Sequence, residues 1–478
     1  MTGLGECRGL MTFPTEFVSL LEEAIGKDGA LAALEVLCSD PGVSVRSNPH
    51  KTDVSSLKEH FGDKVFGEVP WCEEGIFLSE RPSFTLDPWL HGGAYYVQDS
   101  SAMFVGAMLK EVLPSVIEDK GGRPLRVLDL CAAPGGKTTH AASVLRSMCG
   151  DDFILVSNEV MRQRAAVLCQ NVSLWGDPCV VVTSADPAVF SNLASFFDIV
   201  IADVPCSGEG MFRKDEEALR QWSVSNVQMC SARQKRILAD MWPCLRPGGI
   251  LLYSTCTFNR MENDLLVEWA ASELGASFLP VKDYEGLIKT GRGVSLVPGS
   301  VKGEGQYCSV LRKEGSLTSE GSFPVSQRKA PKPARGASSQ LQIPSTVKEC
   351  VSIRCDFFSR GESIIAVPSA IKEETDVLSL LHPVMAGTAL GTVKGKDFIP
   401  DVDLSTSLLL KDGFFPSAEV DKETALSFLH RDSIRLPDAP KGILLLKYSG
   451  VGIGFVKNIG QRCNNLLPPS RRIRMDLQ

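Results

Sequence analysis

The sequence predicts an α/β fold built on a doubly wound parallel sheet, with a smaller unit at each end of the chain. Between residues 100 and 313, short runs rich in β-branched residues alternate with helical patterns. Strands separated by helices imply right-handed crossovers and a parallel sheet. A length of 478 residues exceeds what one core supports, so further domains are expected. The predicted strands of the sheet are residues 127–130, 153–156, 179–182, 199–202 and 250–253.

The segment before this sheet, residues 1–99, is predicted to form a small accessory domain. A helix opens at residues 13–17, because apolar side chains then recur at helical spacing. Residues 43–46 alternate like a short strand. Prolines break the remainder into short elements; they stand at positions 49, 70, 82 and 88.

After the sheet, residues 314–345 are rich in Ser, Gly, Pro, Lys and Gln, which is typical of a flexible linker. Residues 346–478 then form a separate unit. Two of its strands are predicted at residues 441–447 and 452–456, joined by a tight Ser-Gly turn at 449–450.

The composition describes a globular protein, with 44% hydrophobic and 22% charged residues. No apolar run is long enough to cross a bilayer, and residues 1–13 lack the pattern of a secretory signal, so we expect no membrane and a cytoplasmic location. The fifteen cysteines include no Cys-x-x-Cys pair, so no zinc ribbon or other metal site is expected.

The net charge of −7 does not by itself suggest a nucleic-acid binder, but the end of the chain is locally basic. A phosphate-contacting patch and a solvated tail are both compatible with this pattern. The residues concerned are Lys457, Arg462, Arg471, Arg472 and Arg474, against the single acidic residue Asp476.

A glycine-rich turn follows the first predicted strand, at residues 131–137. Glycines let the backbone approach a ligand, and the helix that follows offers free amide groups. Glu159 ends the second strand, where a carboxylate can accept hydrogen bonds from both ribose hydroxyls, and Asp186 follows the third strand, within reach of an adenine amino group. Either carboxylate alone could simply cap a helix. Together with the turn they predict a nucleoside cofactor across the sheet edge.

A nucleotide hydrolase is the rival interpretation of this turn. Gly136-Lys137-Thr138 ends like a phosphate-binding loop, and Asp203 follows an apolar strand as a magnesium-binding aspartate would. Such a loop, however, needs glycine where this chain has Cys131, because the position requires positive φ and close backbone approach. The sequence therefore favours the nucleoside cofactor.

Two cysteines, Cys206 and Cys256, lie at the ends of the fourth and fifth apolar runs. If those runs are neighbouring strands of one parallel sheet, both thiols meet at the edge where ligands bind. A single buried cysteine is usually inert packing. These two differ because each sits where a strand stops, beside polar groups and glycine turns, so the arrangement predicts covalent attack on a substrate.

Three blocks together resemble the Sun-type family of RNA (cytosine-5) methyltransferases. They are Cys-Ala-Ala-Pro-Gly-Gly-Lys at 131–137, Asp-Val-Pro-Cys-Ser-Gly at 203–208 and Ser-Thr-Cys-Thr at 254–257. The extension Gly-Glu-Gly-Met-Phe-Arg-Lys-Asp at 208–215 resembles the bacterial ribosomal RNA methyltransferase F branch of that family.

The resemblance extends over most of the chain. Residues 95–101 resemble the family's entry into the catalytic domain, and residues 450–474 its C-terminal PUA-type RNA-binding domain, whereas residues 346–400 do not align clearly. It implies a Rossmann-like methyltransferase fold. The implied domains are an N-terminal RNA-binding accessory domain (1–99), an S-adenosylmethionine-dependent methyltransferase domain (100–313), the linker (314–345) and a C-terminal RNA-binding region, PUA-like at its end (346–478).

The resemblance also implies roles for the site residues, with S-adenosylmethionine as cofactor and no metal. Cys256 would add to carbon 6 of cytosine, and Cys206 would assist elimination. Asp203 would hydrogen-bond the base, and Lys137 would orient the base or the cysteine, although a purely structural role for Lys137 is equally consistent. The implied cofactor-binding residues are Cys131, Ala132, Ala133, Pro134, Gly135, Gly136, Lys137, Glu159, Asp186 and Asp203.

Contacts to RNA would offset the cost of taking the target base out of its stack. Phe212 and Trp222 could stack on bases, although Trp222 is more typical of a core residue, and Lys51 could touch the RNA. Arg213 and Lys214 could contact phosphates or form ion pairs with neighbouring carboxylates. The candidate phosphate contacts are Arg213, Lys214, Lys457, Arg462, Arg471 and Arg472.

The expected partner is structured RNA, with ribosomal RNA or an assembling ribosomal particle favoured over transfer RNA. A catalytically silent RNA-binding scaffold on the same fold is the alternative from another class. A monomer is the expected state.

Overall fold

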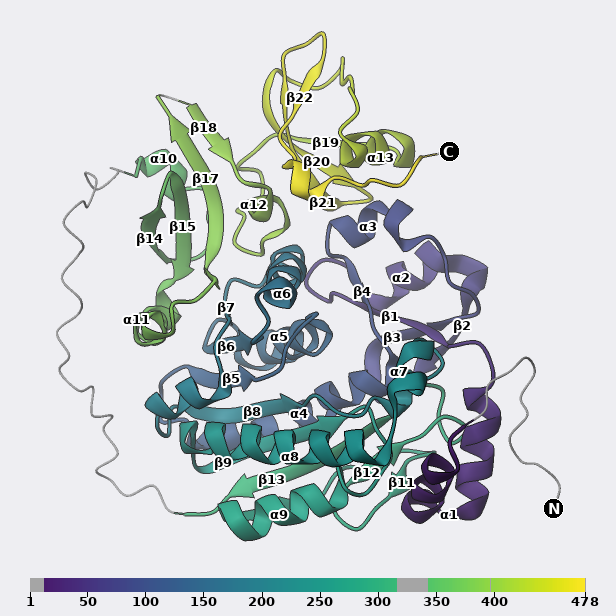
Figure 1. Ribbon diagram of the computed structural model, residues 1–478. Coiled ribbons are helices and arrows are strands. Elements are labelled where there is room, and N and C mark those ends of the chain that lie inside the picture. Colours follow the sequence, from purple (N-terminus) through teal and green to yellow (C-terminus); the bar gives the residue numbers. More distant parts are fainter. Residues whose placement is uncertain (1–12, 316–342, 396, 478) are drawn as a thin grey trace.

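The computed structural model describes residues 13–315, 343–395 and 397–477. Its strands form four sheets, one of ten strands and three of four. The ten-stranded sheet fills the lower half of the molecule in Figure 1, and the smaller sheets lie above it and beside it.

The centre of the large sheet is parallel, as predicted. β5 (Leu125–Asp129) lies between β6 (Phe153–Asn158) and β8 (Phe197–Asp203), and β7 (Val180–Thr183) and β9 (Leu245–Thr255) lie outside these. Each of the five predicted runs overlaps one of these strands. The order of the strands reverses at β5, and α/β sheets bind ligands at the carboxyl ends of the strands beside such a reversal.

Antiparallel strands extend both edges of this parallel centre. β13 (Gln306–Lys313) pairs with β9, and β16 (Met385–Ala386) pairs with β7. Sequence reasoning did not anticipate β16, by which the C-terminal region adds a strand to the large sheet. The remaining edge strands are β10 (Ala276–Leu279), β11 (Ile288–Lys289) and β12 (Val294–Leu296).

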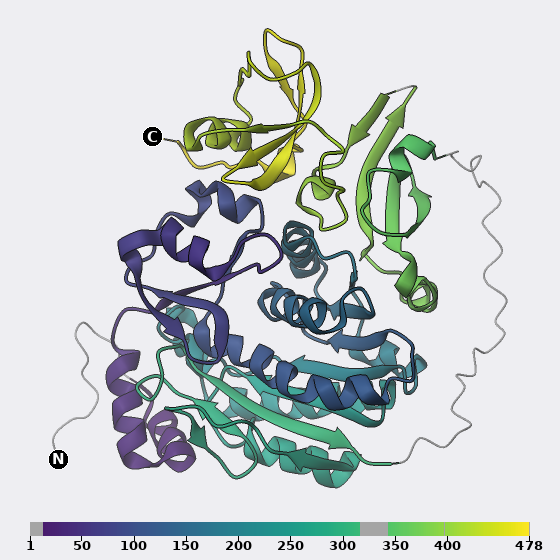
Figure 2. The same ribbon diagram turned by 180° about the vertical axis from the view of Figure 1, so that it is seen from behind.

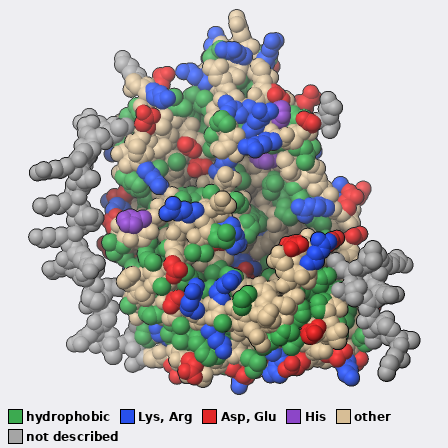
Figure 3. Space-filling view, in the orientation of Figure 1, with side chains coloured by type: hydrophobic (Ala, Val, Ile, Leu, Met, Phe, Trp, Pro, Cys, Tyr) green, Lys and Arg blue, Asp and Glu red, His purple; other side chains and the backbone are tan. Residues whose placement is uncertain are grey.

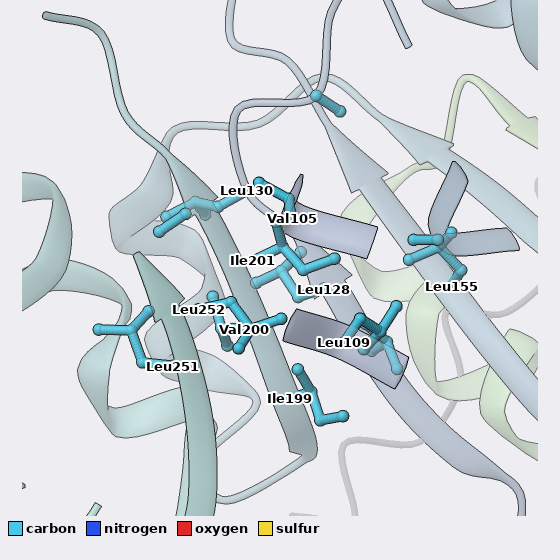
Figure 4. Close-up of a cluster of buried hydrophobic side chains, with 14 of the residues drawn as sticks. Val105, Leu109, Leu128, Leu130, Leu155, Ile199, Val200, Ile201, Leu251 and Leu252 are labelled. Carbon is cyan, nitrogen blue, oxygen red and sulfur yellow. The ribbon is translucent and has the colours of Figure 1, made fainter. Parts of the chain in front are cut away.

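Helices cover both faces of the large sheet. Figures 1 and 2 show α8 (Val224–Met241) and α9 (Asp264–Leu274) on one face and α4 (Ser100–Asp119) on the other. In Figure 4, Val105 and Leu109 of α4 lie beside side chains of β5 and β8, all of them buried. Burying each such side chain stabilises the fold by roughly 1.5–3 kcal/mol. The other helices of this unit are α5 (Gly136–Cys149), α6 (Arg162–Trp175) and α7 (Glu216–Gln221).

Among the described residues, α4 is the one helix long and apolar enough to cross a bilayer by length and composition. Of its most apolar window, 61% is buried inside the protein. This burial is what a core helix requires, and it agrees with the packing of α4 on the sheet.

The N-terminal sheet has the order β2-β3-β1-β4. The predicted strand at 43–46 is its β1. The first helix, α1 (Thr15–Leu37), does not cover this sheet, because its buried face joins Phe212, Trp222 and Phe258 of the large unit in a separate apolar cluster. The other elements are β1 (Val43–Ser47), α2 (Val54–Phe61), β2 (Val65–Val69), β3 (Cys72–Leu78), α3 (Pro88–His91) and β4 (Tyr95–Val97).

The C-terminal region folds into two four-stranded sheets. The predicted hairpin is β20 (Gly442–Tyr448) and β21 (Val451–Asn458), and both residues of its turn, Ser449 and Gly450, have positive φ. Most of the predicted linker lies outside the described residues. The other elements are α10 (Ser345–Lys348), β14 (Cys355–Arg360), β15 (Ser363–Pro368), α11 (Lys372–Leu378), β17 (Thr388–Lys394), β18 (Asp397–Pro400), α12 (Val402–Thr406), β19 (Ser417–Glu419), α13 (Lys422–His430) and β22 (Cys463–Asn465).

Candidate active site

The two cysteines singled out in the sequence lie side by side. β8 and β9 are adjacent and parallel, with Asp203 opposite Ser254, so the loops that follow them leave the same sheet edge. The sulfur atoms of Cys206 and Cys256 are 3.2 Å apart. The two thiols, carried by the loops that follow β8 and β9, therefore lie together at the carboxyl end of the sheet.

A buried carboxylate, Glu262, holds the loop of Cys206 in place. Its Oε2 accepts hydrogen bonds from the amide of Ser207 at 3.0 Å and from Nε2 of Gln234 at 2.7 Å. Nε2 of Gln234 also donates to the carbonyl of Pro205 at 3.0 Å. These bonds fix the backbone on both sides of Cys206.

A second buried carboxylate, Glu209, holds the loop that follows Cys256. Its Oε2 accepts hydrogen bonds from the amides of Phe258 at 2.6 Å and Asn259 at 3.1 Å. Its Oε1 accepts from the indole nitrogen of Trp222 at 3.0 Å. Because Glu209 belongs to the Cys206 loop, it ties the two thiol loops together, which limits the freedom of both sulfurs.

Asp203 and Lys137 form an ion pair beside the thiols. Nζ of Lys137 donates to Oδ2 of Asp203 at 2.9 Å, while Oγ of Ser254 and Nε2 of Gln306 donate to Oδ1 at 2.8 and 3.0 Å. Burial acts to lower the pKa of Lys137, but the charge and hydrogen bond of Asp203 outweigh it, so the net shift is upward. Lys137 is therefore a cation at neutral pH, and its charge also interacts with Cys256.

The environment raises the pKa of the Cys206 thiol well above its ordinary value. The largest cause is the hydrogen bond to Cys256, followed by burial and by the negative charges of Cys256, Glu262 and Asp203. Cys206 therefore retains its proton at neutral pH.

The glycine-rich turn lies at the same edge, between β5 and α5. Gly135 has a φ of +115°, a conformation that favours glycine, and it immediately precedes α5. The turn is held from outside by α6, because Asn171 donates to the carbonyl of Pro134 at 2.7 Å and Arg164 to that of Ala133 at 2.9 Å. The amides at the start of α5 form the anion-binding end of a helix.

Glu159 and Asp186 occupy different environments. Glu159 is buried after β6, accepting from the amide of Met161 at 2.9 Å and pairing with Arg164 at 3.1 Å. Asp186 is exposed after β7, where it caps a short helix by accepting from the amide of Ala188 at 3.0 Å. Both residues lie at the carboxyl edge of the sheet. Asp186 also caps a helix, which was the alternative role that the sequence allowed for it.

Buried polar atoms at this edge fit a polar ligand. Oδ1 of Asp129 at the end of β5, Oγ of Ser157 in β6 and Oγ of Ser184 after β7 are buried without a hydrogen-bond partner among the described residues. Burial raises the pKa of Asp129 to about 7. Three adjacent strands thus present unused polar groups beside the glycine-rich turn, as a nucleoside cofactor would require.

Comparison with known proteins decides the family. The descriptions "N-terminal domain of 16S rRNA methyltransferase RsmF", "16S rRNA methyltransferase RsmB/F" and "Methyltransferase RsmF PUA domain" match residues 13–100, 120–312 and 415–473. The "Ribosomal RNA small subunit methyltransferase F" of Shewanella loihica is 30% identical, over 84% of this chain and 83% of that protein. The protein of the same name from Escherichia coli O81 is 32% identical, over 95% of this chain and 96% of its own. The chain belongs to the ribosomal RNA small subunit methyltransferase F family.

Solved structures confirm the fold of this methyltransferase. A protein described as a methyltransferase homologue from Pyrococcus horikoshii has a TM-score of 0.51 at 24% identity, covering 63% of this chain and 99% of that one. The structure titled "The crystal structure of NSun6 from Pyrococcus horikoshii with SFG" has a TM-score of 0.53 at 18% identity, covering 64% and 99%.

Family membership confirms several expectations drawn from the sequence. The protein is an enzyme, an RNA (cytosine-5) methyltransferase of the ribosomal RNA class that uses S-adenosylmethionine. The Rossmann-like fold and the PUA domain at the C-terminal end are confirmed as well. The nucleotide hydrolase and the silent scaffold are therefore set aside.

Several predicted RNA contacts need correction in this methyltransferase. The side chain of Arg213 is only 5% exposed, because it pairs with Glu304 at 2.7 Å and donates to the carbonyl of Gly303, so it is not available to a phosphate. Phe212 and Trp222 are buried in the cluster around α1 and do not stack on bases. Stacking by Phe212 is therefore wrong, whereas burial confirms the core role favoured for Trp222. Arg213 has the ion pair that was its alternative interpretation, with Glu304 rather than with a neighbouring carboxylate.

The basic residues of the C-terminus are placed differently from one another. Arg471 pairs with Asp403 at 3.0 Å and donates to the carbonyl of Gln170, so it fastens the end of the chain to α6. Arg462 is exposed, and Lys457 is 48% exposed beside Asp397. Arg472 is exposed and contacts His430, and Lys214 is partly exposed near Asp99 and Glu304.

Lys51 is likewise not a surface contact of this methyltransferase. Its Nζ donates to the carbonyls of Gly92 at 2.9 Å and Leu174 at 2.5 Å, which join the N-terminal unit to the end of α6. Burial lowers its pKa to about 7.

Sequence reasoning missed the residues that support Asp203 and the thiols. Glu209 and Glu262 follow the two cysteines closely, so a carboxylate soon after each thiol block was an available signal. Gln306 lies 103 residues from its partner Asp203 and had no such signal.

Proposed function

We propose that Cys256 is the nucleophile of this methyltransferase and that Cys206 assists the release of the methylated base. The observation that supports this division is the 3.2 Å sulfur pair, in which the raised pKa of Cys206 keeps its proton in place. A protonated thiol is a poor nucleophile, so Cys206 is unsuited to the first step. The resemblance of residues 254–257 to the family's nucleophile block assigns the attack to Cys256, and the charge of Lys137, which interacts with this sulfur, would stabilise its thiolate.

The chemistry needs a covalent step because carbon 5 of cytosine is too weak a nucleophile to accept a methyl group unaided. Addition of the Cys256 thiolate to carbon 6 forms a carbon–sulfur bond and turns the ring into an enamine, so carbon 5 becomes reactive. S-adenosylmethionine supplies the methyl group. Removal of the proton from carbon 5 then lets the carbon–sulfur bond break, and Cys256 leaves as a thiolate.

Formation of this adduct changes the state of Cys206. Once the sulfur of Cys256 is bonded to carbon it carries no charge, and the hydrogen bond that is the largest cause of the raised pKa of Cys206 is weakened. We therefore expect the pKa of Cys206 to be lower in the adduct than in the free enzyme. Cys206 becomes a stronger candidate for the base at carbon 5 at the step that needs one.

We assign Asp203 to the target base and Lys137 to both Asp203 and Cys256. After its bond to Lys137, Oδ2 of Asp203 has acceptor capacity left for the amino group of cytosine. Ser254 and Gln306 fix the other oxygen, so the carboxylate is held in one orientation. The ring is thereby positioned for attack.

Replacing Asp203 by asparagine tests this assignment. The amide weakens the pairing with Lys137 and cannot accept as many hydrogen bonds, so we expect kcat to fall by about 10²–10³-fold. The measurement is steady-state methyl transfer with kcat and both KM values resolved. A change confined to KM for S-adenosylmethionine would instead place Asp203 on the cofactor.

For the cofactor, we propose that Glu159 binds the ribose hydroxyls and Asp186 the adenine amino group. The turn at residues 131–137 and the start of α5 would receive the methionine end. The support is the position of all three at one sheet edge, beside the unpartnered oxygens of Asp129, Ser157 and Ser184.

We infer that the substrate is small-subunit ribosomal RNA, because the family descriptions and the relatives carry that substrate in their names. The experiment is in vitro methylation of purified ribosomal RNA, assembling particles and transfer RNA, followed by bisulfite sequencing. We expect 5-methylcytosine in small-subunit RNA alone. Methylation of transfer RNA without ribosomal RNA would assign the enzyme to the alternative substrate.

We propose that Lys457, Arg462 and Arg472 contact RNA phosphates. Figure 3 shows Lys and Arg side chains gathered over the C-terminal unit and on the rim of a hollow between α6 and α7. A rim of positive charge attracts the negatively charged phosphates of the RNA backbone. The target base must also leave its stack to reach the thiols.

The salt dependence of RNA binding tests this surface. Replacing Arg462 and Arg472 by alanine should reduce the slope of log Kd against log salt by about 0.7–0.9 for each phosphate that the protein no longer neutralises. The matched control is Arg236→Ala, an exposed arginine of α8. An equal change in both variants, or none in either, would contradict the assignment.

We infer a cytoplasmic location, because bacterial ribosomal RNA is made and assembled there; the monomer stays a prediction. The division at residues 99, 313 and 345 stays a prediction. Two observations qualify it: α1 packs on the large unit, and β16 joins the large sheet.

A further inference from the structure

A second group of ligand-type side chains lies away from the thiols, where the N-terminal sheet meets α5. Cys72 and Glu74 point to the same face of β3 because they are two residues apart on a strand. His140 comes from α5. The sulfur, the carboxylate oxygen and the ring nitrogen of these residues all lie within 4.8 Å of one another.

The separations within this group suit coordination of one ion. Sγ of Cys72 is 3.7 Å from Nε2 of His140 and 3.5 Å from Oε2 of Glu74. Ligands bound at about 2.0–2.3 Å in a tetrahedron lie at similar distances from one another. Two of the three separations therefore already match a coordination sphere, and the third, between Glu74 and His140, is at most 4.8 Å.

Close packing and a buried arginine hold His140 in place. The imidazole of His140 packs directly on Gly106 of α4, where an added Cβ would lie 2.1 Å from its Cε1. Arg46 of β1 donates to Oγ1 of Thr139 at 2.8 Å and to Oε1 of Gln98 at 2.8 Å, which fastens α5 to the sheet. The position of the ring thus depends on a glycine and on a buried arginine.

The described residues do not provide hydrogen-bond partners for both ring nitrogens of His140. His140 is 4% exposed, and its Nδ1 has no hydrogen-bond partner among the described residues. Its Nε2 has the long contact to the Cys72 thiol. A buried imidazole with so few partners is costly unless a ligand completes it.

The surroundings leave room and charge for a cation. A cavity of about 560 Å³ is lined by Cys72, Glu74 and His140. A divalent ion with one thiolate, one carboxylate and one neutral imidazole has no net charge, so the nearby cations Arg46 and Lys110 do not oppose it. The cavity would provide a water molecule as the fourth ligand.

We propose that Cys72, Glu74 and His140 bind one divalent transition-metal ion, for which Zn²⁺ is the best match. Binding forms three metal–ligand bonds and releases the thiol proton of Cys72 to solvent. Sulfur, nitrogen and oxygen together select zinc over magnesium or calcium. The ion would join the N-terminal sheet to the helix that begins at the cofactor turn. Short-motif reasoning missed it because His140 lies 68 residues from Cys72.

The experiment uses the full chain in a Cys206→Ala/Cys256→Ala background, because the active-site sulfurs, 3.2 Å apart, are a competing pair of zinc ligands. The protein is stripped with a chelator and titrated with Zn²⁺ against a chromophoric competitor. We expect one equivalent to bind with a Kd of about 1 μM or below. Co²⁺ should give a thiolate charge-transfer band.

Variants at the proposed ligands decide the outcome. In this background, Cys72→Ser and His140→Ala should weaken Zn²⁺ binding by about 100-fold or more, and Cys72→Ser should remove the Co²⁺ band. Glu74 is only partly buried, so Glu74→Gln provides a third variant with little risk to folding. The matched control, Cys463→Ser in the C-terminal unit, should bind as the background does. Sub-stoichiometric binding, or unchanged affinity in the ligand variants, would overturn the proposal.

Discussion

Replacing Cys256 by alanine is expected to abolish methyl transfer, with a loss of at least about 10³-fold in kcat. Without this sulfur no bond forms to carbon 6, and carbon 5 stays too weak a nucleophile. The cofactor turn and Glu159 are untouched, so binding of S-adenosylmethionine should stay near normal. The measurements are transfer of a labelled methyl group to ribosomal RNA and calorimetric titration of the cofactor.

The matched control for this variant is Cys244→Ala. Cys244 is buried immediately before β9 begins, at the opposite end of the strand from Cys256. Its truncation should cost about 1 kcal/mol of stability and leave most of the activity. If the Cys256 variant kept more than about a tenth of the activity, that cysteine would have no place in the mechanism.

The second large effect is expected at Cys206. In Cys206→Ala the addition to carbon 6 and the methyl transfer proceed, but the proton on carbon 5 is not removed efficiently. We expect a protein–RNA adduct that survives denaturant, together with a fall in turnover of about 10²-fold or more. Denaturing electrophoresis with labelled RNA measures both the adduct and the free product.

A double variant provides the control for the adduct. Cys206→Ala/Cys256→Ala lacks the proposed nucleophile, so it should form no adduct with the same RNA. Normal turnover by Cys206→Ala without an adduct would show that another group removes the proton. The proposed order of the two sulfurs would then be wrong.

The sheet could be predicted from the sequence because strands buried on both faces consist of continuous apolar runs. The runs at 127–130 and 199–202 each overlap a strand. Cys206 and Cys256 come just after two such runs, and parallel pairing of those strands brings the two thiols together. β16 could not be predicted, because two residues carry no periodicity and its pairing with β7 depends on distant packing.

A site residue could be predicted where its role depends only on the sequence immediately around it. Asp203 is the last residue of β8, and the thiols and the glycine-rich turn lie in the loops that follow strands. The support of Asp203 by Gln306 and the burial of Arg213 by Glu304 depend on pairings 91 or more residues apart. A basic side chain in a loop was interpreted as an RNA contact because nothing in the local sequence reveals a distant carboxylate.

The most direct test is mass spectrometry of the adduct trapped by Cys206→Ala on ribosomal RNA. After digestion with nuclease and protease, we expect a nucleotide attached to the peptide that contains Cys256, through a cytosine that already carries the methyl group. A nucleotide attached to any other residue, or an adduct that lacks the methyl group, would contradict covalent catalysis by Cys256 with release assisted by Cys206.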